Sequence, residues 1–246
     1  METKHWIFLS PHFDDVALSC GGLVWQLTNE GHRVEIWTIM AGLPTEGPYS
    51  EFARQNHEAW GMSGKAAILM RQAEDRAACA ILGASARHCS WRDVIYRQDQ
   101  ETGNPVVNNN EELFGEPPEA YLVEEISQFL VNEIQDTVQL VFPMGLGGHI
   151  DHRVLVQAGK CSAMANLVYA DYPYILTDFS AQETDRNQWA RIPHALGEEA
   201  LTHWQDAALC YTSQLSGFWH NEAEARLALR NYLAGGGGRL WTKVRD

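Results

Sequence analysis

Long apolar segments are missing from this chain of 246 residues, and their absence excludes one class of protein. A membrane-spanning helix needs about 20 consecutive apolar residues, and no uninterrupted run in the sequence approaches that length. The apolar stretch in METKHWIFLS is too short for the core of a signal peptide and leads directly into PHFDD. We therefore expect neither a transmembrane segment nor an export signal.

The chain has few cysteines, and their spacing suggests no pairs. No CxxC pair occurs, and an odd number of cysteines cannot all be bridged within one chain. This pattern argues against a disulfide framework and against a structural zinc site built from cysteine. It favours free thiols in a reducing compartment, so we expect a cytoplasmic protein. The five cysteines are Cys20, Cys79, Cys89, Cys161 and Cys210.

Basic residues are also few, and the formal net charge is −14. A surface of this sign repels a phosphate backbone, and no Lys/Arg cluster reverses it locally, so nucleic acid is not an expected partner. Four consecutive glycines at 235–238 lack the Lys and Ser/Thr of a phosphate-binding P-loop. We interpret them as a turn after a helix.

The pattern of apolar residues predicts alternating strands and helices. Short apolar runs at 5–10, 34–40, 138–143 and 167–169 are typical of buried strands, and helical spacing is seen between them at 16–31, 66–82 and 119–134. No repeat or shift in composition marks a boundary, so we predict a single domain over 1–246. The predicted fold is a Rossmann-like three-layer α/β sandwich with a mostly parallel sheet.

Two polar motifs, PHFDD at 11–15 and GGHIDH at 147–152, each follow a predicted strand. Ligands of parallel sheets bind beyond the carboxyl ends of the strands, so the two motifs can converge on one site. Each motif taken alone is also compatible with a polar helix start, because Asp is favoured at helix N-termini. Together they offer imidazoles and carboxylates, and three N/O ligands plus water are typical of catalytic zinc and of hydrolysis.

PHFDD resembles the PHPDD signature, and HIDH the HxDH signature, of the LmbE/PIG-L family of zinc-dependent de-N-acetylases. The segments AGLP, RQAEDRAACAILGA and YADYPY also look like bacterial members, so the resemblance covers most of the chain. One position departs from the signature: Phe13 stands where the family usually has proline. Phenylalanine gives up the backbone restraint of proline and adds a ring.

The resemblance implies a metal-dependent hydrolase that removes an N-acetyl group from an amino sugar, glycoconjugate or related small molecule. It implies one Zn²⁺ per chain, although a His/Asp set also accepts other divalent metals. His12, Asp15 and His152 are the implied metal ligands, and Asp14 is the implied general base. His149 is expected to stabilise the oxyanion or protonate the leaving amine, with Asp151 orienting it.

Several further expectations concern substrate and assembly. Arg71 resembles a family arginine near the active site, and we expect it to hold a polar part of the substrate. The alternatives are removal of a different N-acyl group, or a non-catalytic Rossmann-like module for sugar or nucleotide, which the carboxylates in the first strand–helix turn oppose. Long loops at 42–50 and 96–118 are candidates for substrate contact. Trp60 is expected in the core, and the chain can form a homo-oligomer.

Overall fold

The central strand β1 (His5–Ser10) explains how the core is divided. Its alternate side chains enter different clusters: Trp6 and Phe8 pack with one group of helices, and Ile7 and Leu9 with another. A strand that is buried on both faces is expected to be apolar at successive positions, as this one is. The computed structural model describes residues 2–178 and 189–244.

Among these residues, seven strands form one sheet in the order β3-β2-β1-β4-β5-β7-β6. The five strands from β3 to β5 run parallel, whereas β7 pairs antiparallel with β5 and with β6. The strands are β1, β2 (Arg33–Thr38), β3 (Ser85–His88), β4 (Val138–Pro143), β5 (Leu167–Tyr169), β6 (Trp189–Arg191) and β7 (Leu240–Lys243).

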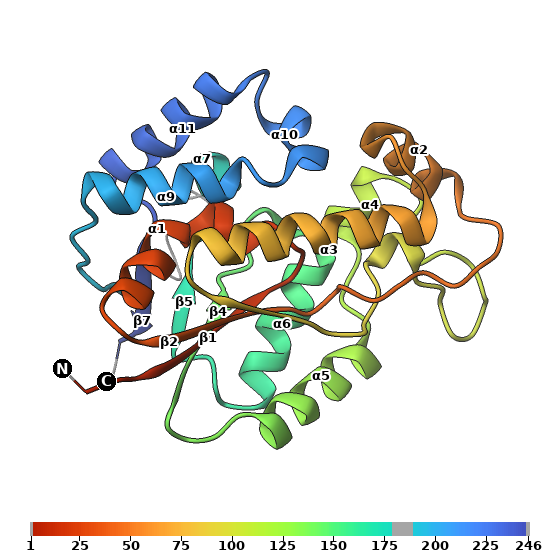
Figure 1. Ribbon diagram of the computed structural model, residues 1–246. Coiled ribbons are helices and arrows are strands. Elements are labelled where there is room, and N and C mark those ends of the chain that lie inside the picture. Colours follow the sequence, from red (N-terminus) through yellow and green to blue (C-terminus); the bar gives the residue numbers. More distant parts are fainter. Residues whose placement is uncertain (1, 179–188, 245–246) are drawn as a thin grey trace.

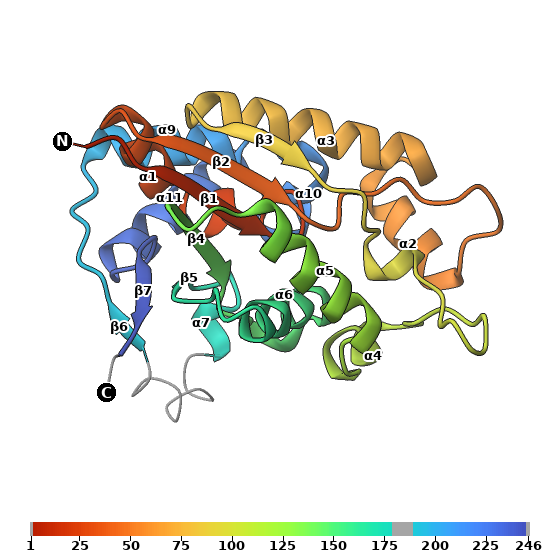
Figure 2. The same cartoon turned by 90° about the horizontal axis from the view of Figure 1, so that it is seen from below.

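Helices cover both faces of this sheet and complete three layers. α1, α3 and α9 lie on one side, with α10 and α11 outside them, and α5 and α6 lie on the other side (Figures 1 and 2). The structure thus confirms the predicted α/β sandwich. The helices are α1 (Asp15–Asn29), α2 (Glu51–Trp60), α3 (Gly64–Ile81), α4 (Asn110–Gly115), α5 (Ala120–Glu133), α6 (Ile150–Cys161), α7 (Ile175–Asp178), α9 (Glu198–Ala208), α10 (Thr212–Phe218) and α11 (Glu222–Ala234), with short 3₁₀ turns η1 (Val94–Tyr96) and η2 (Leu146–Gly148).

The four apolar runs that were predicted as strands correspond to β1, β2, β4 and β5. Three strands were not predicted. β3 has the polar sequence SARH and lies at one edge of the sheet, β6 is a short strand at the other edge, and β7 is a short strand between β5 and β6. All three are short and only partly buried, so they lack the apolar pattern on which a prediction depends. The glycines at 235–238 lie between α11 and β7, as a turn would.

Close packing of α1 against α9 places the first polar motif. The indole of Trp204 lies over Gly21, where an added Cβ would come within 2.7 Å of the ring, and its Nε1–H donates to the Ala17 carbonyl at 2.6 Å. The helix departs from regular geometry beside this contact, at Cys20 (φ −151°, ψ 27°). The first turn of α1, which begins at Asp15, is therefore anchored from the helix layer as well as from β1.

In the part of the chain that the structure describes, no helix combines the length and apolar character needed to cross a membrane.

Candidate metal-dependent active site

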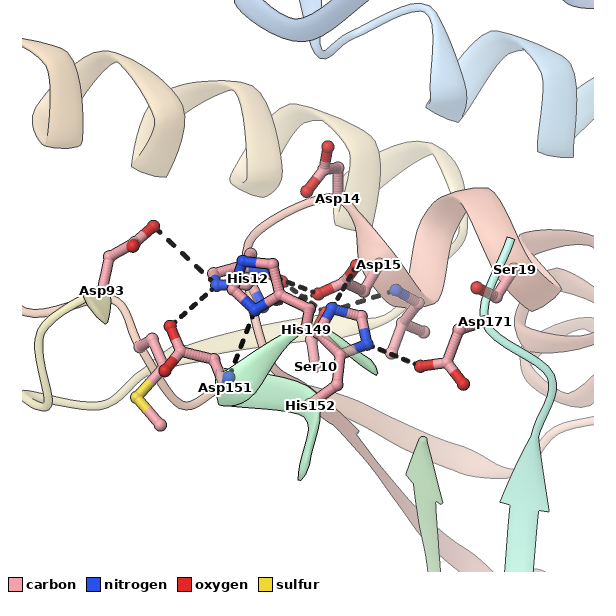
Figure 3. Close-up of polar contacts among 12 residues, drawn as sticks. Ser10, His12, Asp14, Asp15, Ser19, Asp93, His149, Asp151, His152 and Asp171 are labelled. Carbon is pink, nitrogen blue, oxygen red and sulfur yellow. Dashed lines mark hydrogen bonds and ion pairs between the residues drawn. The ribbon is translucent and has the colours of Figure 1, made fainter. Parts of the chain in front are cut away.

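The two predicted motifs meet at the carboxyl ends of β1 and β4, which are neighbours in the sheet. This is the position where helices on opposite faces begin, α1 after β1 and α6 after β4, and where α/β sheets commonly bind ligands. Segments that follow β3 and β5 bring Asp93 and Asp171 to the same end of the sheet. Figure 3 shows the resulting cluster of buried imidazole and carboxylate groups.

The first motif is held in shape by its own polar groups. Ser10 Oγ donates to the His12 carbonyl at 2.5 Å and accepts the Val16 amide at 3.2 Å, while the His12 amide donates to Asp15 Oδ2 at 2.7 Å. Asp14 occupies the N-cap position of α1, yet its side chain makes no capping hydrogen bond and is buried. A simple capping role therefore does not account for Asp14.

Asp15 lies between two histidines. Its Oδ2 is 3.3 Å from His12 Nδ1, and its Oδ1 is 3.3 Å from His152 Nε2. The other ring nitrogen of each histidine faces a different carboxylate: His12 Nε2 is 3.0 Å from Asp151 Oδ2, and His152 Nδ1 is 2.7 Å from Asp171 Oδ1 (Figure 3). A carboxylate on the far nitrogen is the usual way to fix the tautomer and orientation of a metal-binding histidine.

The buried imidazoles and carboxylates of this cluster shift one another's pKa values. Burial lowers the pKa of His152, but Asp15 and Asp171 together raise that pKa to about 10. Although burial alone would raise the pKa of Asp15, His152 and His12 hold it well below its ordinary value. Without a cation, protons on the imidazoles balance the buried carboxylate. A divalent ion bound by the same nitrogen and oxygen atoms would replace these protons as the positive charge. The His/Asp/His set therefore fits zinc.

Other donors lie close enough to take part. Across the described residues, two groups of three have donor atoms within 4.8 Å of one another: His12, His149 and His152, and His12, Asp93 and Asp151. Both groups contain His12, so they belong to one cluster. Nitrogen and carboxylate oxygen donors without cysteine are typical of a catalytic metal site.

Asp151 makes contacts that differ from the expected ones. Its carboxylate lies 2.7 Å from Arg97 Nη1 and accepts the Val94 amide at 3.1 Å, in addition to its contact with His12. Burial alone would raise the pKa of Asp151, but Arg97 and His12 lower it by more, so the net pKa is below its ordinary value and the carboxyl group is an anion. Asp151 was expected to orient His149; its carboxylate contacts His12, because the start of α6 turns it toward η1, and its backbone amide contacts His149.

His149 is instead fixed by a backbone contact. Its Nδ1 accepts the Asp151 amide at 3.2 Å, as the N-cap of α6. Burial and the neighbouring His12 lower the pKa of His149 well below its ordinary value, so the ring is neutral. Because Nδ1 accepts, the proton of the neutral ring is on Nε2, which makes Nε2–H a hydrogen-bond donor.

Asp14 is buried on the side of the cluster facing α3. Burial raises its pKa, while Arg71, with Nη2 3.5 Å from Asp14 Oδ1, limits that rise. A carboxylate whose pKa is shifted toward neutrality is a stronger base than an exposed one. The structure thus brings together all seven predicted site residues: His12, Asp14, Asp15, Arg71, His149, Asp151 and His152.

A cavity of about 220 Å³ opens over this cluster. Trp60, which was expected in the core, lines it, and so do Phe114 and Tyr174. The loop at 42–50 does not line it; residues 44–50 line a separate cavity of about 240 Å³. The excursion at 96–118 contributes Leu113 and Phe114 from α4.

The sequence pattern assigned no role in the cluster to three charged residues, Asp93, Arg97 and Asp171, although the segment at 171–174 was expected as a wall of the pocket. For Asp171 a signal was present, because a carboxylate two positions after an apolar run sits at the carboxyl end of a strand. Asp93 and Arg97 flank η1. No strand was predicted directly before this turn, so the sequence offered no basis for placing the two residues at the end of the sheet.

Fold and site together define an α/β protein with a buried His/Asp cluster that fits a metal ion. The family model described as GlcNAc-PI de-N-acetylase, PIG-L, matches residues 7–162. This range contains both motifs and more than half of the chain, so the protein belongs to the PIG-L family.

Three relatives illustrate the similarity. The chain is 29% identical over 245 residues to 2'-N-acetylparomamine deacetylase of Niallia circulans, covering 92% of this chain and 86% of that protein. Its structure resembles the zinc-inhibited form of teicoplanin deacetylase at a TM-score of 0.81, with 24% identity and 99% of each chain covered. It also resembles the A40926 pseudoaglycone deacetylase Dbv21 at a TM-score of 0.70, with 28% identity and 99% and 98% covered.

Proposed function

We propose that this protein is a zinc-dependent hydrolase that removes the N-acetyl group of an amino sugar or of a small glycoconjugate that carries one. The observation that carries the proposal is Asp15 between His12 Nδ1 and His152 Nε2, with buried Asp14 beside it. Membership of a de-N-acetylase family supports the reaction. Relatives named as deacetylases of amino-sugar natural products support the substrate class.

His12, Asp15 and His152 would hold the metal, which supplies a Lewis acid that polarises the acetyl carbonyl and acidifies water. Asp14 accepts a proton from the attacking water, and its raised pKa suits it to return that proton to the leaving amine. The Nε2–H of neutral His149 donates to the carbonyl oxygen as negative charge develops there. The lowered pKa of His149 supports this role over that of a proton donor to the amine.

The remaining expectations follow from the same residues. We place the whole chain in one catalytic domain, since the proposed residues come from both halves of a continuous sheet. All these residues belong to one chain, so the chemistry requires no second copy, and a homo-oligomer remains compatible with it. A cytoplasmic location is supported by the free cysteines, none of which is bridged.

The experiment combines metal content with acetate release. Zinc-loaded wild type, Asp14→Asn and His152→Ala are incubated with N-acetylated glucosamines, paromamine-type sugars and glycopeptide sugars. We expect about one zinc per wild-type chain. Asp14→Asn should retain the metal but lose about 10²- to 10⁴-fold in kcat, because a general base contributes that much.

His152→Ala should lose both metal and activity, because it removes a proposed ligand. Wild type that binds zinc but releases no acetate would redirect the search to other N-acyl groups, tested on the same sugars. Wild type that binds no metal from a zinc solution would refute the proposed site.

A further inference from the structure

The guanidinium of Arg71 lies over two aromatic rings beside the catalytic cavity. Its Cζ is 5.3 Å from the ring centroid of Phe13 and 5.0 Å from that of Trp60. Phe13 comes from the first motif, Arg71 from α3 and Trp60 from the last position of α2. Three separate segments therefore meet at one guanidinium, and we call these three residues the arginine clamp: Phe13, Arg71 and Trp60.

The polar contacts of Arg71 do not by themselves fix its orientation. The side chain is buried, with 4% of the residue exposed, and the ion pair with Asp14 is a single contact of 3.5 Å. Its Nε is buried and has no hydrogen-bond partner among the described residues. A guanidinium with one long contact can rotate, whereas stacking on two aromatic faces restricts its plane.

The two rings are held in different ways. Phe13 is 1% exposed and its ring meets His88 edge-on, with centroids 5.3 Å apart. The imidazole of His88 is in turn 2.7 Å from Asp75, so this face of the clamp rests on the interior. Trp60 is only partly buried and lines the catalytic cavity together with Asn56 of the same helix. The clamp thus couples α2 to Asp14.

We propose that Phe13 and Trp60 are positioning residues for deacetylation: they hold the plane of Arg71 so that it stays beside Asp14 and keeps Nε–H available to an acceptor atom of the substrate. This inference rests on the proposed function. It differs from a packing role, because the rings act through Arg71. Their contribution should vanish when Arg71 is removed.

A double-mutant cycle tests the dependence. Trp60→Leu and Phe13→Leu keep an apolar side chain but remove an aromatic face, and Trp60→Phe restores a face. We expect kcat/KM to fall about 5- to 30-fold in each Leu variant, mainly through KM, the range of a desolvated cation–π contact. Trp60→Phe should recover most of the loss. In an Arg71→Met background, Trp60→Leu should cost less than about twofold, since nothing is left to stack.

Phe129→Leu is the matched control. Arg87 also lies over two rings, with Cζ 4.1 Å from the centroid of Trp37 and 5.2 Å from that of Phe129, but Arg87 belongs to β3 at the edge of the sheet. Removing this second stack should leave both kinetic constants unchanged. Zinc content is measured for every variant, so that a loss of activity caused by loss of the metal is distinguished from one caused by loss of the aromatic contact.

A readout that does not need activity is the Nε–H resonance of Arg71, assigned by its loss in Arg71→Lys. Ring currents should shift it in the wild type, and it should move in both Leu variants but not in Phe129→Leu. A resonance that responds to neither Leu variant, or an equal kinetic cost of Trp60→Leu with and without Arg71, would overturn the proposal. A responsive resonance without acetate release from any sugar would contradict the proposed function and leave the placement of Arg71 intact.

Discussion

Asp171 holds the outer nitrogen of a proposed metal ligand and does not line the cavity. Its Oδ1 is 2.7 Å from His152 Nδ1, and its Oδ2 accepts the amides of Gly145 and Leu146 at 2.8 and 3.0 Å. One side chain thus connects the end of β5, the loop after β4 and the start of α6. The inner nitrogen of His152 can bind a metal only while its outer nitrogen keeps the proton.

Asp171→Asn should weaken zinc binding. If its amide oxygen continues to accept from the loop amides, its NH₂ faces His152 Nδ1 and favours the tautomer that is protonated on Nε2. We expect zinc affinity to fall about 10- to 100-fold, measured by competition with a chelator. Asp206→Asn, which removes a carboxylate paired with Arg226 at the surface, is the control. Equal affinity of Asp171→Asn and wild type would show that the contact does not orient the ligand.

Helix α2 packs on the hydrophobic core through Phe52 and Ala53 and makes a polar contact through His57. His57 Nε2 lies 2.7 Å from Tyr96 Oη in η1, and the Gly64 amide donates to the same nitrogen at 3.3 Å. Because an amide N–H can only donate, Nε2 is the acceptor. Trp60, at the end of this helix, belongs to the arginine clamp. The position of α2 therefore affects the mouth of the cavity.

This contact should make stability sensitive to acid. Burial lowers the pKa of His57, so between the ordinary histidine value near 6.5 and the lower folded value the unfolded chain binds more protons. Stability contributed by neutral His57 is then present at higher pH and is lost as pH falls, by at most about 1.4 kcal/mol per pH unit. Urea unfolding of wild type and His57→Gln from about pH 8 to 5 measures the difference.

Glutamine can still accept the Gly64 amide but does not titrate. The free energy of unfolding should therefore decline less steeply with falling pH in His57→Gln than in wild type. Parallel curves for the two proteins would mean that protonation of His57 does not oppose folding.

The molecule as a whole gathers several buried carboxylates at one end of its sheet, and the chain carries a net charge of −14. A bound cation reduces repulsion among these groups and binds the folded state alone, since the ligands come from distant segments. Metal binding should therefore appear as a gain in global stability, independent of any substrate.

Zinc should raise the melting temperature of the metal-free protein. At a free concentration 100 times Kd, binding contributes about 2.7 kcal/mol, which corresponds to roughly 5–10 °C for a domain of this size. Differential scanning fluorimetry with and without zinc measures the shift, and His152→Ala should remove most of it. An unchanged shift in His152→Ala would place the stabilising ion elsewhere.

Local sequence was sufficient to locate the four apolar strands and the two polar motifs. Burial on both faces requires a continuous apolar run, as in β1, and a motif directly behind such a run must lie at the carboxyl end of the sheet. The seven site residues and their convergence could therefore be predicted, with the family resemblance supplying their roles. The strands β3, β6 and β7 could not, because they are short and carry no continuous apolar run.

The partner of each polar group depended on the folded chain. Whether Asp151 faces His12 or His149 is set by the turn at the start of α6, and Asp171 reaches His152 only because β5 lies beside β4. In the sequence, nothing distinguishes Phe13 and Trp60 from aromatic residues of the core. Only the packing of α2 and α3 brings both of them to Arg71. Such contacts join residues far apart in sequence, so they arise from packing between elements, which local patterns of residues do not encode.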